Sequence, residues 1–297
     1  MIPRKDILRA VLWMSGAVAS FLIMAFAGKA LSSSLDTFEI MTWRSLTGVV
    51  IMVAVITARR GWSGIGTQRM GLHILRNIAH FTGQNLWFFA VALIPVAQVF
   101  ALEFTSPLWV LVLSPLVLGE RLTRMRVLAA LLGFAGILMV TRPGAQSLSP
   151  GVIAAAVAAV AFAVTLVCTK RLTRDVPTLS IIFWMTVTQS VFGLVCAGYD
   201  LDFAMPTWQT LPLLVLVGCC GLLAHFCITT ALSFAPATLV VPIDFTRLPL
   251  AVLIGTLFAG ETLDIWVLAG AAVIFAGNYL NIRGETRRPV APAAAAS

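Results

Sequence analysis

Long apolar runs alternate with short polar segments along the whole chain. A helix needs about 20 mostly apolar residues to cross the hydrocarbon core of a bilayer, and ten runs approach that length. The runs are continuous rather than alternating, which favours helices over a membrane β-barrel. The pattern predicts an all-α integral membrane protein with ten transmembrane helices, at 7–28, 37–58, 71–93, 95–118, 125–142, 150–169, 178–198, 209–233, 236–259 and 263–282.

The second half of the chain repeats the first at an offset of 141 residues. Each half holds five predicted spans, and because five is odd, the second half enters the membrane in the opposite direction. This predicts two inverted-topology five-helix repeats, at 7–142 and 150–283, and a flexible cytoplasmic tail at 284–297, an arrangement typical of secondary transporters. The matched pairs include Pro95 with Pro236, Glu103-Phe104-Thr105 with Asp244-Phe245-Thr246, Lys29 with Lys170, and Trp43 with Trp184.

Composition and charge support a membrane location. Hydrophobic residues make up 60% of the chain, and charged residues only 11%, against roughly 25% in soluble domains. The net charge of +8 is spread over short clusters between apolar runs, which argues against a nucleic-acid-binding face. With the N-terminus in the cytoplasm, fifteen Lys and Arg residues fall on the cytoplasmic side and only Lys29 and Arg142 outside. This bias predicts a bacterial inner-membrane protein with both termini in the cytoplasm.

Two motifs recur at the same register in both halves. Each predicted fourth helix of a repeat starts at a proline and ends in Gly-Glu, at Gly119-Glu120 and Gly260-Glu261. Each fifth helix carries a glycine-rich stripe, at 133–136 and 275–277. Over about residues 7–285 the chain resembles the EamA branch of the drug/metabolite transporter superfamily. The resemblance implies an inner-membrane carrier that moves small metabolites, often outward, and is strongest to bacterial exporters of amino acids, including aromatic ones.

Five charged residues lie deep inside the predicted spans: Arg44, Arg76, Glu103, Asp244 and Arg247. Counting 1.5 Å of rise per residue places Arg44 at the same depth in the membrane as Glu103, and Arg76 at the same depth as Asp244. Arg44 with Glu103, and Arg76 with Asp244, are therefore candidate charge pairs. These pairs either bind helices together or gate a cavity. Arg247 follows Asp244 by three residues on the same helical face. The repeat places Ser106 opposite Arg247, and this asymmetry predicts a substrate contact, for which an amino-acid carboxylate suits a guanidinium.

Other polar and aromatic residues of the spans complete the predicted substrate site. His80, Gln84 and His225 are expected to contact substrate, although interhelical hydrogen bonding is an equal alternative for a membrane histidine. The deep Trp109 and Trp184 are expected to line the cavity, with core packing as the alternative. Pro107 in the fourth span and Pro249 in the ninth predict kinks that either open a cavity or tune packing.

The chain shows no HExxH, GxSxG or Walker motif, and no cofactor or metal is expected. An intramembrane enzyme, with His80 near Glu103 as its thin candidate site, and a channel are the rival interpretations. The preferred prediction is a carrier that works by alternating access and whose partners are membrane lipid and a small-molecule substrate. Proton coupling and uniport both stay open, because embedded acids and histidines serve either.

Overall fold

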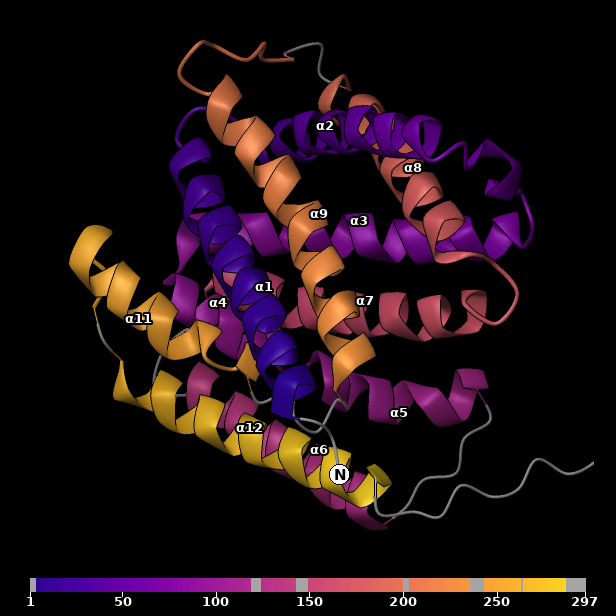
Figure 1. Ribbon diagram of the computed structural model, residues 1–297. Helices are drawn as coiled ribbons and strands as arrows, with labels where there is room; N and C mark the ends of the chain where they lie inside the picture. The colour runs from indigo at the N-terminus through magenta and orange to yellow at the C-terminus, as the bar shows by residue number, and fades with distance from the viewer. Residues whose placement is uncertain are drawn as a thin grey trace, which may run out of the picture.

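The computed structural model describes residues 4–118, 124–142, 149–199, 203–235, 243–262 and 264–286. Regular secondary structure in these residues is entirely helical, which confirms the all-α fold class (Figure 1). The helices are α1 (Arg4–Leu31), α2 (Thr37–Ala58), the 3₁₀ turn η1 (Trp62–Gly64), α3 (Met70–Leu93), α4 (Val96–Glu103), α5 (Ser106–Leu118), α6 (Arg124–Thr141), α7 (Pro150–Leu172), α8 (Thr178–Ala197), α9 (Leu211–Phe234), α11 (Arg247–Phe258) and α12 (Ile265–Thr286).

Six helical stretches among the described residues are long and apolar enough to cross a membrane. They correspond to α1, α2, α4 with α5, α7, α8 and α9. The helix α3 has sufficient length but carries a stripe of polar residues that lowers its hydropathy, and α6, α11 and α12 are apolar over shorter lengths. The chain is therefore a multi-pass membrane protein, while the count of ten spans stays a prediction.

The predicted fourth span, 95–118, is broken rather than continuous. Its two parts, α4 and α5, are separated by a turn at Phe104 and Thr105. Pro107 explains the break, because its ring excludes the carbonyl oxygen of Glu103, four residues earlier, from a helical hydrogen bond. That oxygen instead accepts a hydrogen bond of 2.7 Å from the Ser106 hydroxyl. The kink expected at Pro107 is thus a complete interruption.

The same break recurs in the second half. A turn at Phe245 and Thr246 precedes α11, three residues before Pro249. The Thr246 hydroxyl donates to the Ile243 carbonyl over 2.6 Å, as the equivalent Thr105 hydroxyl does to the Leu102 carbonyl. The repeat seen in the sequence therefore corresponds to a repeated local structure. Pro236, predicted to start this span, lies outside the described residues, as do Gly119, Glu120 and residues 287–297.

Helices of the two halves pack against one another in a symmetric pattern. The main helix pairs are α1 with α9, α7 with α3, α2 with α8 and α6 with α12, and Figure 1 shows these pairs side by side. At the 141-residue offset, α1 is equivalent to α7 and α3 to α9, so the α1–α9 pair corresponds to the α7–α3 pair. The α2–α8 and α6–α12 pairs are each formed by two equivalent helices. The pattern of helix packing is therefore approximately symmetric under exchange of the two halves.

Glycines bring α6 and α12 together, and one of them, Gly136, belongs to the glycine-rich stripe of the sequence. A Cβ atom on Gly136 would lie 2.7 Å from the Gly270 carbonyl oxygen, and a Cβ atom on Gly270 would lie 2.7 Å from the Gly136 carbonyl oxygen. Only glycine permits backbones to approach this closely, and small residues play this role widely in membrane helices. This contact holds one edge of the molecule together, away from the polar interior described next.

Candidate functional site

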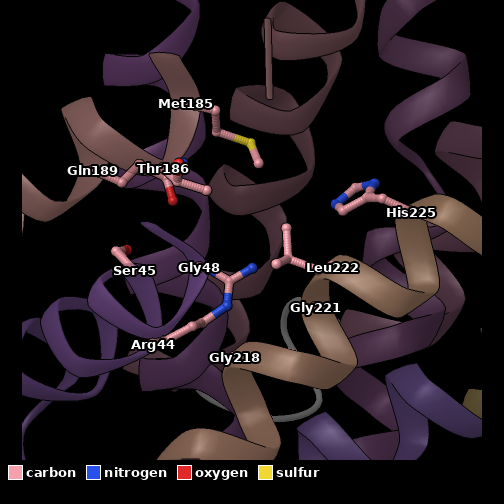
Figure 2. Close-up of a pocket in the computed structure, with 10 residues that line it drawn as sticks. All are labelled: Arg44, Ser45, Gly48, Met185, Thr186, Gln189, Gly218, Gly221, Leu222 and His225. Atoms are coloured by element: carbon pink, nitrogen blue, oxygen red, sulfur yellow. The ribbon is translucent and has the colours of Figure 1, made fainter. Parts of the chain in front are cut away.

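A polar cavity lies between α2, α8 and α9, where the two halves meet. Figure 2 shows its lining, with side chains entering from all three helices. The space at its centre is about 20 Å³, which is room for about one water molecule. Arg44, Ser45 and Gly48 of α2 are the repeat equivalents of Met185, Thr186 and Gln189 of α8, and Gly218, Gly221, Leu222 and His225 of α9 complete the wall.

The start of α2 is fixed by two acids, and this positions Arg44 two turns later. Asp36 and Glu39 form a reciprocal capping box in which each backbone N–H donates 2.8 Å to the other side chain. The second oxygen of Glu39 accepts the backbone N–H of Ala204 over 2.6 Å. The helix that carries Arg44 is therefore anchored to the chain segment that follows α8.

Arg44 is a buried cation without a carboxylate partner among the described residues. Arg44 is only 8% exposed. Its one hydrogen bond to a described residue is to the Met41 sulfur, at 3.5 Å. Its Nε atom is buried without a partner. The guanidinium extends over Gly221 toward Leu222 (Figure 2), and a Cβ atom on Gly221 would lie 2.9 Å from Arg44 Nη2. The absence of a side chain at Gly221 therefore makes room for this charge.

Further polar atoms of the cavity lack partners. Ser45 Oγ and Gln189 Nε2 are both buried with no hydrogen-bond partner among the described residues. A buried polar group left unsatisfied costs about 1–3 kcal/mol, and a buried unpaired charge costs more. Several such groups around one space are typical of a site that a polar ligand completes.

The predicted histidines converge on this region. The rings of His80 on α3 and His225 on α9 lie 6.4 Å apart, and His225 also meets the Phe21 ring at 6.2 Å. His80 is buried and neither of its ring nitrogens has a partner among the described residues, whereas His225 is exposed. Gln84, one turn beyond His80, likewise has an unpartnered oxygen. The structure thus places His80 next to His225, which lines the Arg44 cavity, and contact of His80, Gln84 and His225 with substrate stays a prediction.

Arg247 forms a second, differently built site. Its guanidinium donates to Asp244 Oδ2 at 2.7 Å and to Glu103 Oε1 at 3.2 Å. The rings of Phe21, Phe100 and Phe104 surround it, with centroids 4.4, 5.1 and 4.8 Å from the guanidinium carbon. Trp87 Nε1 donates to the other oxygen of Glu103 over 2.8 Å. Arg247 is therefore satisfied twice by carboxylates and enclosed by aromatic faces.

The charge pairs predicted from depth are not the ones formed. Arg247, rather than Arg44 or Arg76, holds both Glu103 and Asp244. Arg76 instead donates to the Thr169 hydroxyl at 3.1 Å and to the Asn77 side-chain oxygen at 2.9 Å. Depth along a helix does not specify the neighbouring helix: α2 packs on α8 and α9, and α3 packs on α7, whereas α11 packs on α4.

The two predicted tryptophans lie elsewhere. Trp109 packs edge-on against Phe134, at 5.0 Å between ring centroids, where α5 meets α6. Trp184 donates its indole N–H to the Gly66 carbonyl over 2.8 Å, which ties α8 to the segment after η1. Neither residue lines the Arg44 cavity.

Eight of the ten residues that line the cavity were not predicted, among them Ser45, Gln189, Thr186 and Gly221. The repeat held a signal for two of them. In the repeat, Gln189 is equivalent to Gly48, and Gly221 is equivalent to His80. The two halves therefore differ at these positions as strongly as they do at Arg247 and Ser106. Comparing every deep position of the repeat, rather than the acids alone, would have pointed to α2, α8 and α9.

A cluster of ion pairs joins several helices near the start of α4. Lys29 Nζ, from the end of α1, donates to Glu261 Oε1 at 2.5 Å and to the Ile94 carbonyl at 3.2 Å. The other Glu261 oxygen accepts the backbone N–H of Val96 at 3.1 Å. A neighbouring ion pair joins Arg142 to Asp264. Glu261 thus links α1, α4 and the connection between α11 and α12.

Known proteins resemble this chain along most of its length. A riboflavin transporter of Rhizobium johnstonii is 31% identical over 79% of this chain and 78% of its own. A riboflavin transporter of Vibrio cholerae is 28% identical over 95% of both chains. An S-adenosylmethionine uptake transporter of Rickettsia bellii is 25% identical over 87% of this chain and 88% of its own. These relatives are named as transporters and not as enzymes.

A solved structure and a family model match this chain as well. A solved crystal structure, 21% identical, has a TM-score of 0.64 and covers 94% of this chain and 98% of its own, which shows a shared fold. The model of the EamA-like transporter family matches twice, at residues 8–142 and 149–283. The protein therefore belongs to the EamA-like transporter family, within the drug/metabolite transporter superfamily.

Proposed function

We propose that this membrane transporter carries a small organic metabolite with a carboxylate or another strong hydrogen-bond acceptor, which binds to Arg44. The observation that carries the proposal is the unpaired guanidinium of Arg44 inside a cavity whose Ser45 and Gln189 atoms also lack partners. A carboxylate accepts two parallel N–H bonds from a guanidinium. Binding such a group would satisfy a charge that is otherwise costly to bury.

The site suits metabolites that combine an acceptor group with a ring or an apolar part. The relatives are named for riboflavin and S-adenosylmethionine, and the latter molecule carries an amino-acid carboxylate. Phe21 and the histidine rings beside Arg44 offer aromatic faces to such a molecule. Amino acids, which the sequence suggested, share the carboxylate and are the second candidate class. Export was the expected direction, whereas the Rickettsia relative is named an uptake transporter, which favours uptake.

Transport through this site requires alternating access. The space beside Arg44 holds about one water molecule in this conformation, so α2, α8 and α9 must separate before a metabolite enters. The approximately symmetric packing of the halves provides two equivalent conformations, one open to each side of the membrane. We propose ten spans in an inverted-topology arrangement with both termini in the cytoplasm, on the basis of the repeat and the positive-inside bias.

Transport into proteoliposomes tests the proposal. The purified protein is offered riboflavin, S-adenosylmethionine and a panel of amino acids, with uptake and efflux both measured. We expect saturable transport of at least one carboxylate- or acceptor-bearing compound. The Arg44→Met variant should lose about 30-fold or more of transport, because truncating a buried charged partner costs 2–5 kcal/mol.

A matched control is Arg59→Gln, an exposed arginine at the end of the same helix. It should transport normally. Wild-type rates in the Arg44→Met variant would overturn the assignment of Arg44, and non-saturable conduction by the wild-type protein would favour a channel.

A further inference from the structure

We propose that the cluster of Glu103, Arg247 and Asp244 is a proton-binding site that couples transport to the proton gradient. The inference rests on the carrier function proposed above and adds the second, coupled ligand. It concerns a place in the molecule distinct from the Arg44 cavity, and it follows from the charges of the cluster and their surroundings.

The cluster holds one positive charge and two carboxylates. Arg247 donates one N–H to each acid, at 3.2 Å to Glu103 and 2.7 Å to Asp244. With both acids ionised, the cluster carries one excess negative charge in the interior of a membrane protein. An unbalanced charge at this depth is costly, so a neutral form has a strong advantage.

Within the described part of the chain, the cluster has no second cation. The ion pairs that Glu103 and Asp244 make there are both with Arg247. The packed helices contribute uncharged groups: Phe21 from α1, Trp87 from α3 and the Asn278 amide of α12, which donates to the Phe104 carbonyl over 2.8 Å. Packing of α6 and α7 on α4 adds no charge that acts on Glu103 within the described part of the chain.

One proton neutralises the cluster. The reaction converts one carboxylate into a carboxylic acid, takes the proton from water at one side of the membrane, and leaves Arg247 paired with the remaining carboxylate. Asp244 has a free acceptor for this proton, because its Oδ1 atom is buried without a partner in the described structure. Two interacting acids this close titrate as a pair, so the proton belongs to the cluster rather than to either residue.

The position of the cluster links protonation to the conformation. Glu103 ends α4 and Asp244 directly precedes the turn before α11, so each acid sits at the helix break of its own half. The equivalent Phe104 and Phe245 stack at 4.3 Å between centroids, which places the cluster where the two halves meet. A proton on Glu103 leaves Arg247 paired with Asp244 of its own half and removes the ion pair between the halves, whereas a proton on Asp244 leaves that ion pair in place. A proton on Glu103 thereby changes how the two halves are held together.

A chain of ring contacts joins the cluster to the substrate cavity. Phe21 covers the guanidinium of Arg247 at 4.4 Å on one side and meets the His225 ring at 6.2 Å on another. His225 lines the cavity that contains Arg44. A movement of Arg247 between its two acids therefore reaches the substrate site through two packed rings.

The test measures protons directly in vesicles that contain the full chain. A pH-sensitive dye inside the vesicles reports proton movement when substrate is added, and we expect about one proton per substrate molecule. The Glu103→Gln and Asp244→Asn variants mimic the neutral cluster. Each should still exchange substrate across the membrane, but its substrate-driven proton movement should vanish. Two variants guard against a folding defect in either one.

Glu261→Gln is the matched control, because Glu261 belongs to a balanced pair with Lys29. It should keep the proton stoichiometry of the wild-type protein. Proton movement that persists in both cluster variants, or accumulation driven by sodium instead of protons, would overturn the inference. Saturable transport without any proton movement would also overturn it while leaving the proposed carrier function intact.

A measurement without substrate separates the two proposals further. The infrared band of a protonated buried carboxyl group should appear on titration of the wild-type protein in lipid and disappear in Glu103→Gln and Asp244→Asn. If no compound of the panel is transported but this band behaves as expected, the carrier proposal fails and the proton site stands. If the band is absent from the wild-type protein, the proton site fails.

Discussion

Three arginines are buried among the described residues, and two of them, Arg44 and Arg247, have surroundings that differ in almost every respect. Arg247 donates to two carboxylates and is covered by three phenylalanine rings. Arg44 has only a methionine sulfur as its hydrogen-bond partner among the described residues, and it faces a cavity. Both break the internal repeat, since Ser106 and Met185 occupy the equivalent positions.

The protein itself provides carboxylate partners for Arg247, whereas we propose that a ligand provides the partner for Arg44. Removing one partner of a buried ion pair is strongly destabilising, whereas replacing a buried unpaired charge with an apolar group removes the cost of burying that charge. Substitution of Arg44 should therefore reduce transport without reducing stability, whereas substitution of Arg247 should reduce stability. The following experiments use that contrast.

The largest effect on stability is expected for Arg247→Met. This change leaves Glu103 and Asp244 facing one another without a cation, which should cost about 3–5 kcal/mol. Thermal unfolding in detergent measures the loss. The triple variant Arg247→Met, Glu103→Gln, Asp244→Asn removes all three charges and should recover most of it. A stable Arg247→Met protein would show that the acids are not held by Arg247.

An exchange of residues across the repeat should restore part of the transport lost at Arg44. Met185 lines the same cavity from α8 at the equivalent position. The double variant Arg44→Met, Met185→Arg returns one guanidinium to the cavity from the opposite side. Transport should rise at least severalfold above that of Arg44→Met alone. If the double variant folds and stays inactive, the helix that carries the arginine matters as much as its charge.

The smallest effect is expected for Gly221→Ala. The new Cβ atom would lie 2.9 Å from Arg44 Nη2, so the flexible end of the arginine must shift by a few tenths of an ångström. We expect KM to rise by up to about tenfold, equivalent to roughly 1.4 kcal/mol, with little change in stability. Gly71→Ala is the control, because a Cβ atom there meets open space. An unchanged KM would place the substrate away from this end of Arg44.

Much of the fold was predictable because hydropathy and the repeat are properties of the linear sequence. The all-helical class follows from composition, and a distortion at Pro107 follows from proline stereochemistry, although a kink was predicted and the helix is interrupted. The neighbourhood of Asp244 and Arg247 was also predictable, since a spacing of three residues fixes a shared face. These features depend on one helix at a time.

The partners across helices were not predictable in the same way. Matching depths gave Arg44 to Glu103, but depth does not specify which helix lies beside which, or how each is rotated about its axis. Trp184 shows the same limit: its position within a span suggested a cavity lining, whereas its indole N–H reaches a loop carbonyl at Gly66. His80 and His225 were each expected to contact substrate, but the 6.4 Å approach of their rings depends on how the helices pack and could not be read from the sequence.

The most direct test of the central claim measures substrate binding and thermal stability together in Arg44→Met. If Arg44 is kept for the ligand, the purified variant should be as stable as the wild-type protein or more stable, and its affinity for the transported compound should fall by about 30-fold or more. Wild-type affinity, or a loss of stability as large as that expected for Arg247→Met, would show that Arg44 serves the fold instead of the substrate.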